Sequence, residues 1–220
     1  MLAAPAQIKA VIFDMDGVLL FSSDGHRLAY EQTLAPIGIT DFSYAEVAGM
    51  RTDEAFKKIF SRINQPLSEV RLQRLVKEKR QRALAAFGDR AKLAPAGHGL
   101  INDLRQRNYR VALASSASPA TVEFFLSRCG YREAFETILD GSSVKEAKPS
   151  PQIYLLAANR LAVEPAACLV VEDSQSGVAA AVAAGMRVMG VAGTEPIKRL
   201  AAAGAHQVVT DLAEISALLS

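Results

Sequence analysis

The chain has 220 residues, 50% of them hydrophobic, which is enough to bury a sizeable core in one domain, with or without a smaller insertion. Its formal net charge of +2 does not indicate a nucleic-acid partner, and no basic run alternates with aromatic residues. No apolar run reaches the roughly 20 residues of a membrane span. Residues 1–7 lack the charged and apolar regions of a signal peptide, so we expect a cytoplasmic protein. Cys129 and Cys168 have no CxxC spacing and are expected to be buried thiols without a disulfide.

The first apolar run, residues 8–13, is β-branched and interrupted only by Lys9, which predicts a strand buried on both faces of a sheet. Similar runs predict strands at residues 111–114 and 168–171, with weaker ones at 137–139, 187–191 and 207–209. Helical stretches are predicted between them at 98–107, 119–128, 151–161 and 176–184. This alternation predicts an α/β fold with a parallel sheet.

Residues 21–92 break that rhythm. They contain no convincing buried strand, and stretches such as 67–87 are helical and rich in Lys and Arg. The Pro-Ala-Gly sequence at 95–97 marks the return to the α/β pattern. We therefore predict a catalytic core made of residues 1–20 and 93–220, with a helical cap domain, residues 21–92, inserted after the first strand.

Polar residues follow the predicted strands at the points where the strands end. Asp14 ends the first strand, Ser115 and Ser116 follow the strand at 111–114, and Glu172 and Asp173 follow the strand at 168–171. In open parallel sheets, ligands bind beyond the carboxyl ends of the strands. We therefore expect these side chains at one edge of the sheet.

Carboxylates crowded at one edge repel each other and require a cation, and oxygen ligands beside a phosphate favour Mg²⁺. We expect Asp14 and Asp173 to be direct ligands, with Asp16 contributing its backbone carbonyl. Glu172 is expected to orient a metal-bound water. Lys148, just before a predicted helix, can join this group.

Asp14 and Asp16 are two residues apart, and the chain turns at Gly17, so their side chains can flank one substrate from different angles. One carboxylate can attack phosphorus while the other acts first as acid and then as base. On their own, two aspartates in a turn are also common as loop or capping residues. The serine, lysine and acidic groups at the other strand ends favour the catalytic interpretation.

Four short motifs occur in the order typical of the haloacid dehalogenase superfamily, and the chain resembles its branch of phosphatases and β-phosphoglucomutases with a helical cap. The motifs are FDMDGV at 13–18, LASSAS at 113–118, KPSP at 148–151 and VEDSQSG at 171–177. The resemblance spans nearly the whole chain. It implies a Rossmann-like core and Mg²⁺-assisted phosphoryl transfer through an aspartyl-phosphate.

The resemblance also implies residue roles. Asp14 would be the nucleophile, Asp16 the acid/base, and Lys148 the cation that balances charge. The acids of the fourth motif would hold the metal. The residues assigned to the substrate phosphate are Ser115, Ser116 and Gly17.

His26 falls where many relatives carry a histidine in the first cap helix, and Arg51 falls in the cap loop that faces the core. His26 is expected to contact the substrate or the acid/base, and Arg51 to contact the substrate; the alternatives are an ordinary helix residue and a surface charge. The sequence departs from the family pattern at Phe21, near the expected hinge, and at Gln152, where an acid is common.

These features predict a phosphatase acting on a small phosphorylated metabolite, either a phosphosugar or a phosphoglycolate-like compound. One alternative is a β-phosphoglucomutase-like enzyme, but Ala48 and Thr52 stand where that pattern has a lysine and an arginine. Another alternative is a non-catalytic binding protein on the same fold. A dehalogenase is disfavoured by Asp16 and the acidic fourth motif. The sequence does not indicate an oligomeric state.

Overall fold

A six-stranded parallel sheet lies at the centre of the core, with strand order β5-β4-β1-β6-β7-β8. The computed structural model describes residues 7–219, except the side chain of residue 89. Residues 1–6, most of the stretch inspected for a signal peptide, lie outside this range. The strands are β1 (Ala10–Phe13), β4 (Arg110–Ala114), β5 (Thr137–Leu139), β6 (Cys168–Glu172), β7 (Arg187–Val191) and β8 (Gln207–Val209). The predicted parallel α/β core is confirmed.

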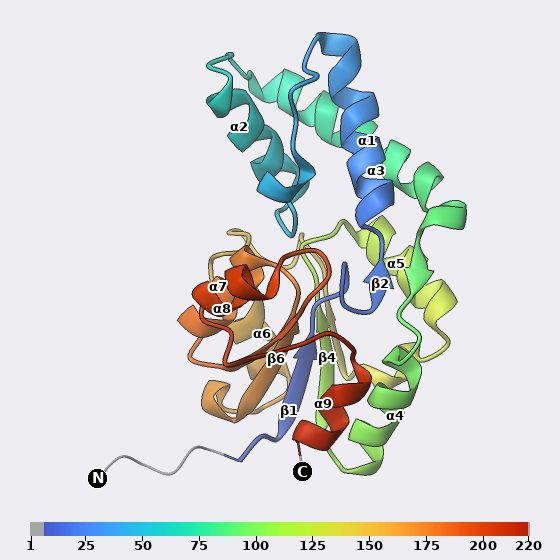
Figure 1. Ribbon diagram of the computed structural model, residues 1–220, viewed down its shortest axis with the longest axis vertical. Helices are drawn as coiled ribbons and strands as arrows, with labels where there is room; N and C mark the ends of the chain where they lie inside the picture. Colours follow the sequence, from blue (N-terminus) through green and yellow to red (C-terminus); the bar gives the residue numbers. More distant parts are fainter. Residues whose placement is uncertain (1–6, 220) are drawn as a thin grey trace.

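Helices cover both faces of this sheet (Figure 1). Val11 and Phe13 of β1 point into one layer, Ala10 and Ile12 point into the other, and all four are fully buried. The run is apolar without alternation because both faces of the strand are covered. The first layer contains α4 (Gly97–Gln106), α5 (Pro119–Cys129) and α9 (Ala213–Leu218); the second contains α6 (Gln152–Arg160), α7 (Gln175–Ala183) and α8 (Ile197–Ala202).

The cap stands above the core as a separate group of helices with its own apolar centre (Figure 1). It contains α1 (Ser23–Leu34), α2 (Thr52–Arg62) and α3 (Glu69–Arg90). Tyr30, Phe56 and Leu75, one from each helix, are almost completely buried in that centre. Ser68 begins the long helix α3 as a capping residue, because its hydroxyl accepts from the Arg71 amide at 3.3 Å.

The two linkers between core and cap pair with each other. Strands β2 (Leu20–Phe21) and β3 (Lys92–Leu93) form an antiparallel ribbon in which Leu20 faces Leu93 and Phe21 faces Lys92. The sequence gives no signal for this ribbon, since two residues are too few to show a period. Phe21, which departs from the family pattern, is 46% exposed on this ribbon.

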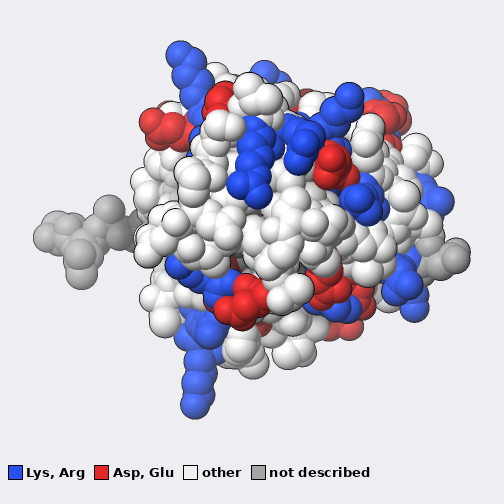
Figure 2. Space-filling model, turned by 90° about the horizontal axis from the view of Figure 1, so that it is seen from above, with Lys and Arg blue, Asp and Glu red and all other residues white. Residues whose placement is uncertain are grey.

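The surface of the cap carries Lys and Arg side chains interspersed with Asp and Glu (Figure 2). Within residues 7–219, no helix is long and apolar enough to cross a membrane. Cys129 and Cys168 are both buried free thiols, as predicted.

Candidate active site

Lys148 joins two carboxylates at the carboxyl edge of the sheet. Its Nζ donates to Asp14 Oδ1 at 2.5 Å, to Glu172 Oε1 at 2.8 Å and to the Ala114 carbonyl at 3.3 Å. These bonds use all three ammonium hydrogens. Burial would lower the pKa of Lys148, but the two carboxylates raise it well above its ordinary value. Lys148 is therefore a permanent positive charge beside Asp14.

Asp14 follows β1 directly, and its amide donates to the Val171 carbonyl at 3.0 Å, which fixes it between the two central strands. Burial raises the pKa of its carboxyl group to about 7, against the attraction of Lys148, and the negative charges of Glu172 and Asp16 add to the rise. A nucleophilic carboxylate must be ionised. The site therefore favours a further positive charge next to Asp14.

Glu172 is surrounded by protein donors. Its Oε1 accepts from Lys148 and from the Tyr154 hydroxyl at 3.0 Å, while Oε2 accepts from the Asp173 amide at 2.9 Å and from the Ser174 amide and hydroxyl at 2.8 and 2.9 Å. Gly177 packs so closely that a Cβ there would lie 1.6 Å from Glu172 Oε1. This arrangement suits a residue that positions Lys148 better than one that orients a metal-bound water.

Asp173 is the carboxylate that best fits a metal ion. It is 4% exposed, and burial together with the charges of Glu172 and Asp14 raises its pKa well above the ordinary value. Among the described residues it forms no salt bridge, and the Thr194 hydroxyl is its hydrogen-bond donor. A buried carboxylate without a cationic partner suits a hard cation.

The sequence predicts a metal held by the side chains of Asp14 and Asp173 and by the Asp16 backbone carbonyl, with Glu172 orienting a bound water. Within residues 7–219, no group of three or more His, Cys, Asp or Glu side chains is arranged to hold a metal. Asp14 and Asp173 remain, and Mg²⁺ is commonly bound by one or two carboxylates and several waters. Gly17 leaves room beside them: its φ is +79°, and a Cβ there would lie 1.7 Å from Asp173 Oδ2.

Asp16, the second aspartate of the first motif, contacts the cap. Asp16 Oδ1 accepts a short hydrogen bond from the Ser22 hydroxyl and lies 3.2 Å from His26 Nε2. Burial alone would raise the pKa of Asp16, but His26, Ser22 and Lys79 together hold it below its ordinary value. The structure thus brings His26 to the predicted acid/base.

Lys79 continues this line of polar groups into the cap. Its Nζ lies 2.7 Å from His26 Nδ1 and 4.4 Å from the centre of the Tyr30 ring, and the residue is only 4% exposed. Burial lowers its pKa to about 7. Lys79 is not among the residues predicted from the sequence, although its position in the apolar pattern of α3 could have indicated it. It falls at helical spacing on the apolar face of α3, where its neighbours are Leu72, Leu75, Val76 and Ala83.

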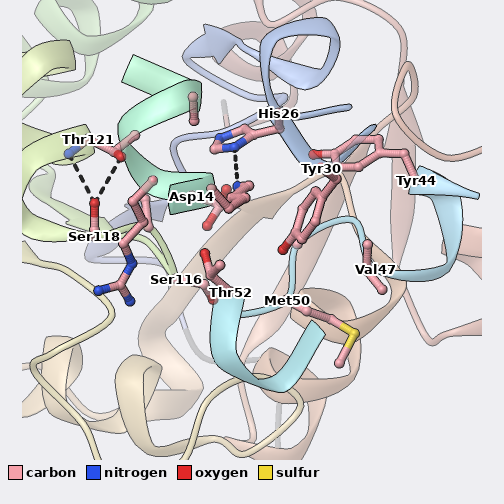
Figure 3. Close-up of a pocket in the computed structure, with 15 residues that line it drawn as sticks. Asp14, His26, Tyr30, Tyr44, Val47, Met50, Thr52, Ser116, Ser118 and Thr121 are labelled. Carbon is pink, nitrogen blue, oxygen red and sulfur yellow. Dashed lines mark hydrogen bonds between the residues drawn. The ribbon is translucent and has the colours of Figure 1, made fainter. Parts of the chain in front are cut away.

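A cavity of about 40 Å³ lies between Asp14 and the cap. Figure 3 shows Asp14 and Ser116 of the core facing His26, Tyr30 and Thr52 of the cap across this space. The cap lies directly against the core here, because His26 contacts Asp16 and Arg51 donates to the Lys145 carbonyl. The cap is therefore closed onto the core.

Ser115 and Ser116 occupy different places at the end of β4. Ser116 lines the cavity. Ser115 is 1% exposed, and its hydroxyl accepts from the Ala117 amide at 3.0 Å, which shapes the loop between β4 and α5.

Arg51 lies outside this cavity. Its Nε donates to Asp53 Oδ1 at 2.7 Å and its Nη2 to Asp53 Oδ2 at 3.0 Å, with a longer contact to Glu54. Its Nη1 donates to the Lys145 carbonyl at 3.0 Å and the Val144 carbonyl at 3.5 Å. Arg51 therefore connects the cap loop to the core loop that precedes Lys148, and its donors are occupied.

The same cap loop touches the fourth motif. Gly49 has a φ of +73°, and a Cβ there would lie 2.5 Å from the Ser174 hydroxyl oxygen. Only glycine allows this approach without movement.

Gln152 and the two histidines outside the cap, His98 and His206, have structural contacts. Gln152 accepts from the Glu146 amide at 3.2 Å. His206 Nδ1 accepts from the Val188 amide at 3.1 Å, and His98 stacks on Tyr131.

Comparison with known proteins identifies the family. Residues 8–185 match the family model described as haloacid dehalogenase-like hydrolase. The chain is 33% identical to protein CbbY of Cereibacter sphaeroides, covering 96% of this chain and 95% of that one. It is 30% identical to hexitol phosphatase B of Escherichia coli K12 over 84% of each chain. The crystal structure of β-phosphoglucomutase from Clostridium difficile superimposes with a TM-score of 0.82 at 27% identity, covering 94% of this chain and 93% of that one. Because the family model matches most of the chain and a relative is 33% identical over nearly its whole length, the chain belongs to the haloacid dehalogenase-like hydrolase family.

Proposed function

We propose that this protein is a Mg²⁺-dependent phosphatase that hydrolyses a small phosphorylated metabolite, a phosphosugar or a phosphoglycolate-like compound, through an aspartyl-phosphate on Asp14. The observation that carries this proposal is the pairing of Asp14 with Lys148 at 2.5 Å, beneath a cap that places His26 on Asp16. A nucleophile, a fixed cation and an acid/base lie at one end of β1.

In the first step, a carboxylate oxygen of Asp14 attacks phosphorus, and the bond from phosphorus to the leaving oxygen breaks. Asp16 gives that oxygen a proton. In the second step, water attacks the phosphorus of the aspartyl-phosphate, Asp16 takes a proton from it, and the Asp14 carboxylate is released with inorganic phosphate. Lys148 neutralises negative charge in both steps. Mg²⁺, held by Asp14 and Asp173 when bound, would supply further neutralisation of the phosphoryl oxygens.

The closed structure holds Asp16 in its ionised form, which is the form required for the second step. The first step needs the protonated form. A negatively charged phosphoryl group beside Asp16 raises its pKa, because the two negative charges repel each other. Substrate binding thus opposes the effect of His26 and Lys79 on this carboxyl group.

The contacts of His26 and Arg51 with the core lie over the cavity beside Asp14. They support the idea that the substrate enters when the cap opens. The paired linkers β2 and β3 offer a hinge for that movement. The similarity to a hexitol phosphatase supports a phosphorylated carbohydrate.

The test is a panel of phosphorylated metabolites assayed for phosphate release with Mg²⁺ or with EDTA. We expect release only with Mg²⁺, and none from the Asp14→Asn variant. Turnover in metal-free buffer, or by Asp14→Asn, would contradict the proposal. A parallel assay supplies β-glucose 1-phosphate with a trace of the bisphosphate. Rapid formation of glucose 6-phosphate with little free phosphate would identify a mutase instead.

A further inference from the structure

Arg80 has a buried donor without an acceptor. Its Nε is buried and has no hydrogen-bond partner, and no salt bridge within residues 7–219 involves this side chain. Arg51, by contrast, has its donors occupied by Asp53 and by core carbonyls. A buried N–H without an acceptor is unfavourable, because it has lost water and gained no hydrogen bond, while the partly exposed remainder of the Arg80 side chain stays open to a ligand.

The position of Arg80 relates it to the substrate. The residue follows Lys79 on α3 and lines the same cavity as Asp14 and Ser116. It also lines a groove of about 250 Å³ between the cap and the core, together with Ser118, Ser142 and the Arg51–Asp53 ion pair. Arg80 therefore lies where the inner cavity meets this groove, on the cap side of the reacting group.

The charges around the cavity are unequal. Among its described lining residues, Asp14 is the one carboxylate and belongs to the core, whereas Lys79 and Arg80 stand on the cap wall. Lys79 contacts His26, whereas Arg80 forms no salt bridge with a carboxylate of the described residues, and its buried Nε has no acceptor. The cap wall thus presents a positive group toward the part of a substrate that is distant from Asp14.

We propose that Arg80 binds a second anionic group of the substrate, a phosphate or a carboxylate, and thereby determines specificity. The planar guanidinium fork matches both groups and can bind either of them with two parallel hydrogen bonds. This inference rests on the proposed phosphatase function and narrows its substrate class to phosphomonoesters with a further negative charge.

The test compares substrates that differ only in the second anion. Fructose 1,6-bisphosphate is paired with fructose 1-phosphate for a second phosphate, and 2-phosphoglycolate with 2-hydroxyethyl phosphate for a carboxylate. The variants are Arg80→Met, which keeps the apolar stem, and Arg80→Lys, which keeps the charge. Arg74→Ala, an exposed arginine on the same helix, is the control.

In the wild type, we expect kcat/KM to favour the member that carries the second anionic group in at least one pair. Arg80→Met should lower this preference about tenfold or more, mainly through KM, with partial recovery in Arg80→Lys, because the lost contact is a charge-assisted fork. Arg74→Ala should keep the wild-type preference. The pair that responds identifies the second anion as phosphate or carboxylate.

An unchanged preference in Arg80→Met, or an equal loss on both members of each pair, would overturn the proposal. Phosphate release from p-nitrophenyl phosphate by the wild type, and its loss in Asp14→Asn, tests the phosphatase function separately. If the wild type releases no phosphate, calorimetric titration of each pair into the wild type and Arg80→Met still tests the Arg80 contact. Absence of any affinity difference would then reject it.

Discussion

The Lys79 ammonium nitrogen lies 2.7 Å from Nδ1 of His26, although the two residues are on different cap helices. An ammonium group can only donate, so a charged Lys79 requires Nδ1 to be the acceptor. Neutral His26 then carries its proton on Nε2, which faces Asp16 Oδ1 at 3.2 Å. Packing of α3 against α1 within the cap therefore sets the tautomer of His26 while Lys79 is charged, and this tautomer points its Nε2 proton at the predicted acid/base.

The depressed pKa of Lys79 predicts a pH dependence of stability. Its pKa is lowered from 10.5 to about 7 in the folded protein, mainly by burial. Between these values the unfolded chain binds more protons, so the contribution of Lys79 to stability increases as pH rises through this range and is lost as pH falls toward 7. We expect the unfolding free energy of the wild type, relative to Lys79→Met, to increase from pH 7 to pH 9.5. Urea titrations at both pH values measure this difference, and a constant difference would contradict it.

His26 should matter most for poor leaving groups. His26→Gln removes the ring that holds Asp16. We expect kcat to fall on alkyl phosphates by about 10²-fold, the lower end of acid–base contributions, and to fall much less on p-nitrophenyl phosphate, whose leaving group needs little protonation. A series of aryl and alkyl phosphates measures the dependence on leaving-group pKa. An equal loss on all of them would assign His26 a structural role only.

Asp173 should control the metal requirement. Asp173→Asn keeps the size of a side chain that is 4% exposed but removes its charge. We expect the Mg²⁺ concentration for half-maximal activity to rise about tenfold or more, since even residues that only support a metal site contribute 10–100-fold. The measurement is a Mg²⁺ titration of phosphate release. Thr210→Val, at an exposed threonine, should leave the titration unchanged.

Gly177 should tolerate no side chain. A Cβ there would lie 1.6 Å from Glu172 Oε1, which is itself held by Lys148 and Tyr154. We expect Gly177→Ala to displace Lys148 and abolish most activity, with a loss of about 1–3 kcal/mol of stability from overpacking.

Gly99 of α4 is the matched control, because it is exposed and a Cβ there meets nothing within 4 Å. We expect Gly99→Ala to keep full activity and gain about 0.5–1 kcal/mol from helix propensity. Equal activity in the two alanine variants would refute the steric argument.

Arg51 should affect all substrates alike. Arg51→Ala removes the bonds to the Lys145 and Val144 carbonyls and so loosens the closed cap. We expect KM to rise by a similar factor for every accepted substrate, with or without a second anion, because the Arg51 donors are engaged by protein acceptors even though the residue lines the same groove as Arg80. Steady-state kinetics over the substrate pairs described above separate this effect from that of Arg80. A KM change confined to substrates with a second anionic group would indicate that Arg51 contacts the substrate directly.

The core could be predicted from the sequence because its strands are buried on both faces, which produces unbroken apolar runs that end in polar residues at one edge. Asp14 and Asp173 were predicted at that edge in this way, whereas Lys148 was predicted from its place before a helix and from the third motif. The cap residues were harder to predict. Lys79 and Arg80 belong to a helix in which basic side chains are common, and packing of that helix against α1 decides which of them are buried. The sequence predicted a metal-bound water for Glu172 and a substrate contact for Arg51, because it could not show the hydrogen-bond partners distant in sequence that engage both side chains.

The pairing of β2 with β3 means that the chain leaves the core and re-enters it at neighbouring points. The sheet carrying Asp14, Lys148 and Asp173 needs no segment from between those points to complete its strand order. Insertions whose ends are close together are the ones that folded domains accept. A cap can therefore be inserted or exchanged at this point without breaking the core sheet, but a new cap must again supply the groups that Ser22, His26 and Lys79 place around Asp16.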